Sequence, residues 1–476
     1  MKVLHISMEC FPAAKSGGLG DVVGALPIYL NRAGLSSSVI IPRYGTRWLN
    51  QQSCREVFSS HIRLGNELVW FSIEAVENAQ LGFDLYVANI PGKFDRPGIY
   101  ADPGGGWYSD EVERCLCFQQ AVLKWILSMH WRPQMLHCHD HHTGLIPFMV
   151  KYCPEFRPLH YLPTIFTIHN GEYHGAFSWW KAGLLPTFYQ EARSLLDWGD
   201  AICPLASALK CCWRFTTVSP GYLDELRHHA NGMESLVNRE LEKGRGILNG
   251  IDAELWNPAT DALIAHRLED GDIEGYKKKN KLRLHDRFRI IPRLPIVTFI
   301  GRLVREKGAD IIPDTVRRVV GSGIQVGFVI LGTGDQDTMA EIARLRGEFS
   351  GYCDVSLEYN EALAHQLYAG ADFLFMPSRV EPCGLNQMYA CRYGTVPIVR
   401  SVGGLRDTIV DIGDPGGRGL RFNNFSLDDT TTSIYRAARI YENEDVMKGL
   451  RQHIMQADFS WERAAGDYIH LYNEFA

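Results

Sequence analysis

The chain has 476 residues, 46% of them hydrophobic and 22% charged, and a formal net charge of −6 at pH 7. This composition is ordinary for a soluble globular protein, and the length suits two or three domains. The negative balance argues against broad nucleic-acid binding. No apolar run reaches the roughly 18 residues of a membrane span. The 12 cysteines are scattered without a Cys-x-x-Cys pair, and the first residues indicate a strand rather than a cleavable signal, so we expect a cytoplasmic protein.

The N-terminal region predicts the opening of a doubly wound α/β sheet. Residues 3–7 and 38–42 have the pattern of buried strands, and residues 19–31 between them have helical periodicity. The connecting loop contains Lys15, Gly17 and Gly18. Glycines let a backbone approach a ligand closely, and this lysine stands beside a predicted helix N-terminus. The spacing matches neither a dinucleotide fingerprint nor a P-loop, which argues against an NAD enzyme.

Three later apolar runs, residues 134–140, 163–170 and 215–220, read as strands that end in polar side chains. Among these, Asp140 and His169 are interpreted as groups that bind sugar hydroxyls, with hydrogen bonding inside the loops as the structural alternative. His137 and His139 would share one strand face, which is typical of metal ligands. We nevertheless expect no metal site, because the sequence offers no distant His or Cys cluster to complete a ligand set.

A second alternating series begins after a polar stretch, residues 252–293, that reads as connecting helices. Its strands are predicted at residues 294–300, 326–331 and 355–357, followed by two more around residue 381. Residues 461–475 form an amphipathic terminal helix that could pack on either half of the chain. We therefore place a domain boundary near residue 245.

Glu381 lies in a loop between an apolar run at residues 372–377 and a predicted helix at residues 387–393. Ligands of open α/β sheets bind outside the carboxyl ends of the strands, so chemistry is expected here. The backbone N–H groups of residues 383–386 would form an anion cradle at the helix N-terminus. The alternative is an ordinary helix cap beside a solvated glutamate.

Two cations and one aromatic residue extend this hypothesis. Arg302 and Lys307 follow the strand at residues 294–300, and together they are suited to clamp a diphosphate. Surface charge at a strand end is the alternative. Tyr359, just before a predicted helix, has the face to stack on a nucleobase, or to serve as a packing aromatic.

These motifs, taken in order, resemble the glycogen synthase and starch synthase family of retaining glucosyltransferases, and the resemblance covers nearly the whole chain. Each motif is weak alone, and their common order makes the resemblance specific. The matching segments are Lys15-Ser16-Gly17-Gly18-Leu19, residues 137–141, Thr167-Ile168-His169-Asn170, residues 217–220, residues 248–252, Arg302 through Gly308, and Glu381-Pro382-Cys383-Gly384-Leu385.

The resemblance implies a GT-B fold, in which two Rossmann-like α/β domains face a central cleft. Residues 1–244, joined by a C-terminal helix at residues 459–476, would form the acceptor-side domain, and residues 245–458 the nucleotide-sugar-binding domain. The implied reaction transfers glucose from ADP-glucose to the non-reducing end of an α-1,4-glucan such as glycogen or a maltooligosaccharide, with retention of configuration. It implies no metal and no other cofactor.

The family also implies roles for individual residues. The catalytic residues would be Glu381, Arg302, Lys307 and His169. Acceptor-binding residues would be Glu9, Asp21 and Asp140. Donor-binding residues would be Lys15, Gly17, Gly18, Asn249, Tyr359, Cys383, Gly384, Leu385 and Asn386.

The sequence departs from the pattern of the family or of the wider fold at Asn386 and Tyr389, and two other functions are alternatives. Asn386 stands where many bacterial members have Thr, which blurs the choice between ADP-glucose and UDP-glucose. Tyr389 stands where the wider fold would have a second glutamate. A glucan phosphorylase-like enzyme would need a pyridoxal lysine. A catalytically silent glucan-binding homologue is the non-enzyme alternative, disfavoured because Lys15, Arg302, Lys307 and Glu381 are all present.

Overall fold

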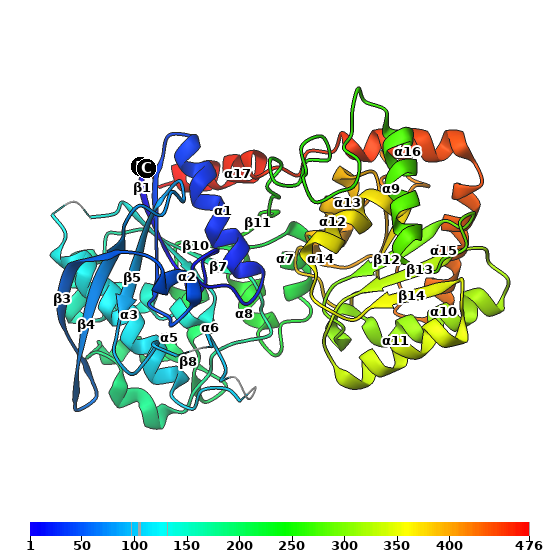
Figure 1. The fold of residues 1–476 in the computed structure, drawn as a ribbon. Coiled ribbons are helices and arrows are strands. Elements are labelled where there is room, and N and C mark those ends of the chain that lie inside the picture. The colour runs from blue at the N-terminus through cyan, green and yellow to red at the C-terminus, as the bar shows by residue number, and fades with distance from the viewer. Residues whose placement is uncertain (97, 103–105, 131, 476) are drawn as a thin grey trace. The chain divides into compact units, whose positions relative to one another are not determined.

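The computed structural model describes residues 1–96, 98–102, 106–130 and 132–475, and its contacts divide the chain into two units (Figure 1). Unit 1 contains Met1–Val218, Leu223–Ile247 and Ala464–Ala476, and unit 2 contains Ser219–Tyr222 and Leu248–Arg463. The domain boundaries expected at residues 244 and 458 stay predictions. In the part of the chain that is described, no helix is long and apolar enough to cross a membrane.

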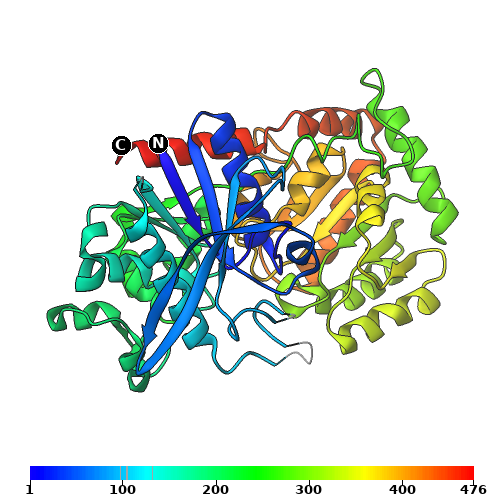
Figure 2. The same ribbon diagram turned by 60° about the vertical axis from the view of Figure 1, so that its left-hand side comes forward.

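Unit 1 is built on a nine-stranded sheet with the order β11-β10-β7-β6-β1-β2-β5-β4-β3. The pairs from β11 through β5 are parallel, while β3 and β4 form antiparallel pairs at one edge. Figure 2 shows β3 and β4 as a long antiparallel pair. The strands are β1 (Lys2–Ile6), β2 (Ser36–Pro42), β3 (Cys54–Leu64), β4 (Glu67–Val76), β5 (Asp84–Asn89), β6 (Met135–His139), β7 (Thr164–Ile168), β10 (Arg214–Thr217) and β11 (Gly244–Gly246), with a separate pair β8 (Asp197–Trp198) and β9 (Ala201–Ile202).

The strand order of unit 1 reverses between β1 and β6. From β1 the chain adds β2 and β5 on one side, and from β6 it adds β7, β10 and β11 on the other. A crevice for ligands opens at such a switch point. The helices are α1 (Gly18–Arg32), α2 (Arg47–Asn50), α3 (Glu111–Ser128), α4 (Ile146–Tyr152), α5 (Arg193–Leu196), α6 (Pro204–Cys211), α7 (Pro220–Leu226), which crosses the unit boundary, α8 (Glu234–Arg239) and α17 (Trp461–Asn473), with 3₁₀ turns η1 (His141–Thr143), η2 (Pro154–Leu159), η3 (Trp179–Leu184), η4 (Gln190–Ala192) and η5 (Leu241–Lys243).

Unit 2 is built on a six-stranded parallel sheet with the order β14-β13-β12-β15-β16-β17. This order reverses between β12 and β15, so unit 2 has a switch point of its own. In Figure 1, α10 and α11 lie on one side of this sheet, and α9, α12 and α13 on the other. The strands are β12 (Ile296–Ile300), β13 (Gly327–Leu331), β14 (Cys353–Ser356), β15 (Phe373–Met376), β16 (Val396–Arg400) and β17 (Leu420–Phe422), and the helices are α9 (Ile273–Arg287), α10 (Ile312–Gly321), α11 (Gln336–Glu348), α12 (Glu361–Gly370), α13 (Asn386–Arg392), α14 (Gly403–Thr408), α15 (Leu427–Tyr441) and α16 (Glu444–Met455), with 3₁₀ turns η6 (Arg305–Lys307) and η7 (Ala309–Ile311).

Local sequence explains where several unit 2 helices begin. Asp335, Asn360 and Asn443 each stand at an N-cap, and each side chain accepts a hydrogen bond from a backbone N–H in the first turn. The predicted strands fall within one or two residues of β12, β13, β14 and β15. One expectation was wrong: residues 252–272 contain no helix, and only α9 occupies the stretch read as connecting helices. Within that segment the side-chain oxygens of Asp252 and Asn257 accept hydrogen bonds from backbone N–H groups two residues further on, which favours turns over a helix.

Candidate functional site

The central feature of unit 2 is an ion pair at its switch point. β12 and β15 are neighbours in the sheet, and the loops after them bring Lys307 and Glu381 together. The Lys307 Nζ atom lies 2.6 Å from Glu381 Oε1, and the Ser378 hydroxyl donates to Glu381 Oε2 at 2.9 Å. Glu381 is buried, so its carboxylate has a fixed direction and two defined partners.

Close backbone packing between the two loops places this pair. Gly308, directly after Lys307, has a φ of +69°, and a Cβ atom there would lie 2.1 Å from the carbonyl oxygen of Pro377. The Arg379 N–H group donates to the Glu306 carbonyl at 2.8 Å. η6 therefore lies directly against the loop that follows β15.

Two glycines of α14 support the loop around Glu381 from the other side. Cβ atoms at Gly403 and Gly404 would each lie 2.1 Å from a carbonyl oxygen, of Glu381 and of Cys383 respectively. The Gln387 side chain adds hydrogen bonds to the carbonyls of Cys383 and Gly384. Only glycine permits this approach, and the sequence analysis assigned these two glycines no role.

The segment Ser219–Tyr222, which belongs to unit 2, also contacts this loop. The Ser219 hydroxyl donates to the Pro382 carbonyl at 2.6 Å, and the Gly221 N–H donates to Asp407 Oδ2 at 2.6 Å. Sequence reasoning missed both contacts, because the partners are more than 160 positions apart in the chain and no local pattern connects them.

The other residues predicted to bind the sugar-nucleotide donor near Glu381 differ in their hydrogen bonds and burial. The Asn386 side chain donates to the Ile300 carbonyl at 2.7 Å, which joins the start of α13 to the end of β12. Leu385 precedes α13 without a side-chain cap bond. Burial raises the pKa of the Cys383 thiol to about 12, so it remains protonated at neutral pH. Asn249 is buried, and its Oδ1 atom has no partner among the described residues, as expected of a group that awaits a ligand or water.

Arg302 and Tyr359 point their side chains toward solvent. The Arg302 side chain is 65% exposed and lies 3.5 Å from the Glu306 carboxylate. Tyr359 is 82% exposed and directly precedes Asn360, the N-cap of α12. Both follow the carboxyl ends of strands, β12 and β14. Both are open to a ligand, and among the contacts of the described residues no hydrogen bond or ion pair joins either side chain to Glu381.

In unit 1 the loop after β1 is organised by Glu9. Its Oε2 atom accepts the N–H groups of Ser16 at 2.5 Å and Gly17 at 2.9 Å, and its Oε1 atom accepts the Tyr100 hydroxyl at 2.7 Å. Burial and the adjacent Glu9 raise the pKa of Tyr100 well above its usual value, which keeps it a donor. Glu9 is itself buried, so in this structure it holds the loop. Tyr100, distant in sequence, was not anticipated.

The tip of this loop is open. Gly17 and Gly18 are exposed, and Cβ atoms at either position would meet nothing within 4 Å. The Lys15 Nζ atom lies 2.6 Å from Asp21 Oδ1, and both side chains are partly exposed. The charges of Lys15 and Asp21 are thus paired at the first turn of α1, at the surface.

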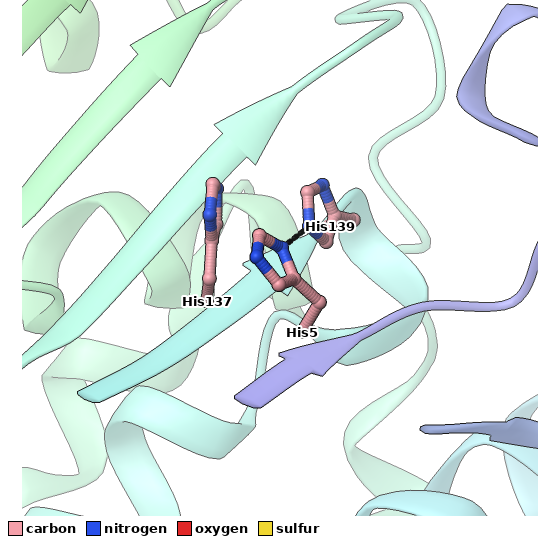
Figure 3. A group of neighbouring side chains, drawn as sticks. All are labelled: His5, His137 and His139. Atoms are coloured by element: carbon pink, nitrogen blue, oxygen red, sulfur yellow. Dashed lines mark hydrogen bonds between the residues drawn. The ribbon is translucent and has the colours of Figure 1, made fainter. Parts of the chain in front are cut away.

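A chain of buried histidines lies along β1 and β6, the two strands that flank the switch point of unit 1; Figure 3 shows three of them, His5, His137 and His139. His5 on β1 stands opposite His137 on β6 in the parallel register. His5 Nδ1 is 3.1 Å from His139 Nε2, and His139 Nδ1 is 3.0 Å from His169 Nε2. His137 is bonded to the Tyr472 hydroxyl at 2.7 Å and to Thr167 Oγ1 at 2.6 Å.

The protonation of these rings follows from burial. Burial lowers the pKa of His5 to about 3 and lowers the pKa of His137, His139 and His169 below the usual value. Each ring is therefore neutral at pH 7 and offers one donor and one acceptor. The Asp140 carboxylate accepts the N–H of His169 at 2.7 Å, so Asp140 and His139 both fix the position of His169. Sequence reasoning identified three of these histidines and missed His5.

Comparison with known proteins identifies the families and relatives that this chain resembles. Residues 2–239 match the family described as starch synthase catalytic domain, and residues 281–429 match glycosyl transferases group 1. The chain is 43% identical to a glycogen synthase of Flavobacterium johnsoniae over 474 residues, with 99% of each chain covered. It is 34% identical to a glycogen synthase of Anoxybacillus flavithermus over 485 residues, covering all of this chain and 98% of the relative.

Solved structures agree with the sequence relatives. The catalytic domain of starch synthase IV from Arabidopsis thaliana, bound to ADP and acarbose, superposes with a TM-score of 0.87 at 30% identity, with 100% and 99% of the two chains covered. A sucrose-phosphate synthase from Thermosynechococcus elongatus, with a TM-score of 0.60 and 18% identity, shares the fold. The predicted fold class, with two α/β domains of the GT-B type, is confirmed. The chain belongs to the glycogen and starch synthase family of glycosyltransferases.

Proposed function

We propose that this chain transfers glucose from ADP-glucose to the non-reducing end of an α-1,4-glucan, with retention of configuration. The relatives are glycogen synthases over their full length, and the starch synthase structure carries ADP and acarbose. The observation that carries the proposal is the buried Glu381 carboxylate paired with Lys307 at the switch point of unit 2. In this pair Lys307 is a positioned cation that can bind a leaving phosphate, and Glu381 is a carboxylate that can accept hydrogen bonds from sugar hydroxyls.

The donor site is proposed around that pair. Arg302 and Lys307 bind the diphosphate, Arg302 through its planar fork and Lys307 as a point charge. Tyr359 stacks on the nucleobase, which its exposed ring permits. Glucose and the distal phosphate contact Glu381, the Asn249 side chain, whose Oδ1 atom has no partner among the described residues, and the segment Cys383, Gly384, Leu385 and Asn386.

The unit 1 residues are proposed to complete the substrate contacts. Lys15 and the backbone at Gly17 and Gly18 bind the donor, which the open loop tip supports. Glu9, Asp21 and Asp140 lie on the acceptor side. For Glu9 and Asp140 this role is one of positioning, since Glu9 holds the loop and Asp140 holds the backbone of His169.

The proposed mechanism is electrostatic. As the glycosidic bond of the donor breaks, negative charge grows on the distal phosphate, and the preorganised cations Arg302 and Lys307 stabilise it. Lys307 exchanges part of its contact with Glu381 for the phosphate. Glu381 then orients the glucosyl group and stabilises its positive charge, while the neutral His169 offers a hydrogen bond to the reacting sugar.

One assay tests the activity. Purified protein is incubated with glycogen and either ADP-glucose or UDP-glucose, and glucose incorporation is measured with and without EDTA. Elongation from ADP-glucose supports the proposal. Binding of glycogen without incorporation from either donor would identify a silent glucan-binding homologue instead, and faster incorporation from UDP-glucose would change the assigned donor.

A further inference from the structure

A second group of histidines in unit 1 lies outside the proposed donor and acceptor residues. His141 and His142 form η1, directly after Asp140, and Glu111 begins α3. One ligand atom from each of these three residues lies within 4.8 Å of the others. The Glu111 Oε1 atom is 3.6 Å from His142 Nε2 and 3.8 Å from His141 Nε2.

These separations are too long for hydrogen bonds but suit two ligands of one ion. Imidazole nitrogen and carboxylate oxygen bind Zn²⁺ at about 2.1 Å, so two ligands of a tetrahedral ion lie roughly 3.4 Å apart. The cluster of His5, His137 and His139 is a poorer candidate for a metal site. Both ring nitrogens of His137 and of His139 are already engaged in hydrogen bonds. That buried group has its hydrogen bonds satisfied without an ion, apart from the unpartnered Nε2 of His5.

The two imidazoles of η1 are held in place by their neighbours. Their rings lie 3.7 Å apart, centre to centre, and the Tyr100 ring stacks on His142 at 5.0 Å. A Cβ atom at Gly175 would lie 2.4 Å from His141 Cδ2, so the backbone there packs directly on the ring. His142 is 7% exposed, and its Nδ1 atom has no partner among the described residues. Preorganised ligands lose little entropy on binding an ion.

The Glu111 side chain is 38% exposed, which gives an ion a path from solvent and leaves room for water ligands. Two imidazoles and one carboxylate with open positions suit Zn²⁺ and neighbouring first-row divalent ions. We propose that Glu111, His141 and His142 form a binding site for a divalent transition-metal ion. The ion would fasten the first turn of α3 to η1, beside Tyr100 and the loop held by Glu9, and glucosyl transfer would not require it.

The test uses the full chain without an affinity tag, stripped with EDTA and dialysed. Titration with Co²⁺, followed by visible absorption, should show one bound ion per chain with nitrogen and oxygen ligands. Zn²⁺ should compete with it and should raise the Tm of the wild-type protein. Glu111→Gln and His141→Gln should each raise the Kd for Co²⁺ at least tenfold and abolish the Tm rise.

Glu113→Gln is the matched control, because Glu113 lies in the same turn of α3 and pairs with Lys181 at 2.7 Å. It should leave the Kd for Co²⁺ unchanged. The Tm of each variant in EDTA, compared with wild type, reports whether the fold is intact. Absence of Co²⁺ binding, binding that Glu111→Gln and His141→Gln leave unchanged, or a thiolate charge-transfer band would overturn the proposal.

Discussion

Replacing Lys307 with methionine separates the structural role of the ion pair from its proposed role in transfer. In the wild-type chain Lys307 Nζ lies 2.6 Å from Glu381 Oε1, and the two side chains are 23% and 7% exposed. The Lys307→Met variant leaves the Glu381 carboxylate buried, with Ser378 as its remaining neutral partner. Removing one partner of a fully buried ion pair costs about 3–5 kcal/mol, because the other charge stays buried without a partner. Because the Lys307 side chain is partly exposed, we expect a loss of roughly 1–3 kcal/mol in the free energy of unfolding.

The assay is a double-mutant cycle with Glu381→Gln. Gln removes the buried charge and keeps the shape, so the double variant should recover at least half of the stability lost in Lys307→Met. Its kcat should stay low, because it lacks both the carboxylate that orients the glucosyl group and the cation aimed at the leaving phosphate, whose loss alone costs on the order of 10²-fold or more. Urea unfolding and glucose incorporation from ADP-glucose are measured on all four proteins.

Lys278→Met is the control, since Lys278 is an exposed lysine of α9 and should change neither quantity. Two results would refute the reasoning. If Lys307→Met unfolds at the same urea concentration as wild type, the ion pair does not stabilise unit 2. If the double variant regains wild-type kcat, neither Lys307 nor Glu381 has its proposed role in transfer.

Arg302→Ala should lower kcat on the order of 10²-fold or more while leaving Tm nearly unchanged, because the side chain is 65% exposed; an effect confined to KM would indicate uniform ground-state binding. Tyr359→Ala should raise KM for the donor about tenfold with little change in kcat or Tm, since stacking on one base contributes about 1–3 kcal/mol; Tyr161→Ala, another exposed tyrosine, serves as control, and an unchanged KM would remove the stacking role. The transfer rate should survive EDTA, because two cations take the place of a metal at the phosphate; loss of activity that Mg²⁺ or Mn²⁺ restores would contradict this. kcat/KM on glycogen should be higher with ADP-glucose than with UDP-glucose, and the reverse order would assign the other donor.

Periodicity and residue type predicted the parts of this molecule that depend on local sequence. Buried strands such as β12 and β15 are short apolar runs bounded by polar residues. The rule that ligands bind beyond the carboxyl ends of strands then placed Glu381 and Lys307 at one edge of a sheet. That they meet as an ion pair depends on the strand order, which the sequence alone does not contain.

The residues that the sequence analysis missed are those that tertiary packing brings in. His5 lies opposite His137 only because β1 and β6 pair in parallel, although the residues are 132 positions apart in the numbering. Tyr100 reaches Glu9 from a distant loop, and Glu111 reaches η1 from α3. The β3–β4 hairpin carried a local signal, the Gly65-Asn66 pair between two alternating runs, that was not used.

The histidine chain has a consequence for how the protein is made. Unit 1 takes its last contacts from Ala464 onward, and the Tyr472 hydroxyl completes the hydrogen bonds of buried His137. Residues 464–475 emerge from the ribosome after every residue of unit 2. All of unit 2 is therefore available for folding while His137 of unit 1 still lacks its tyrosine partner. A chain that stops before Tyr472 would contain the whole of unit 2 but would leave the buried His137 of unit 1 without this hydrogen bond.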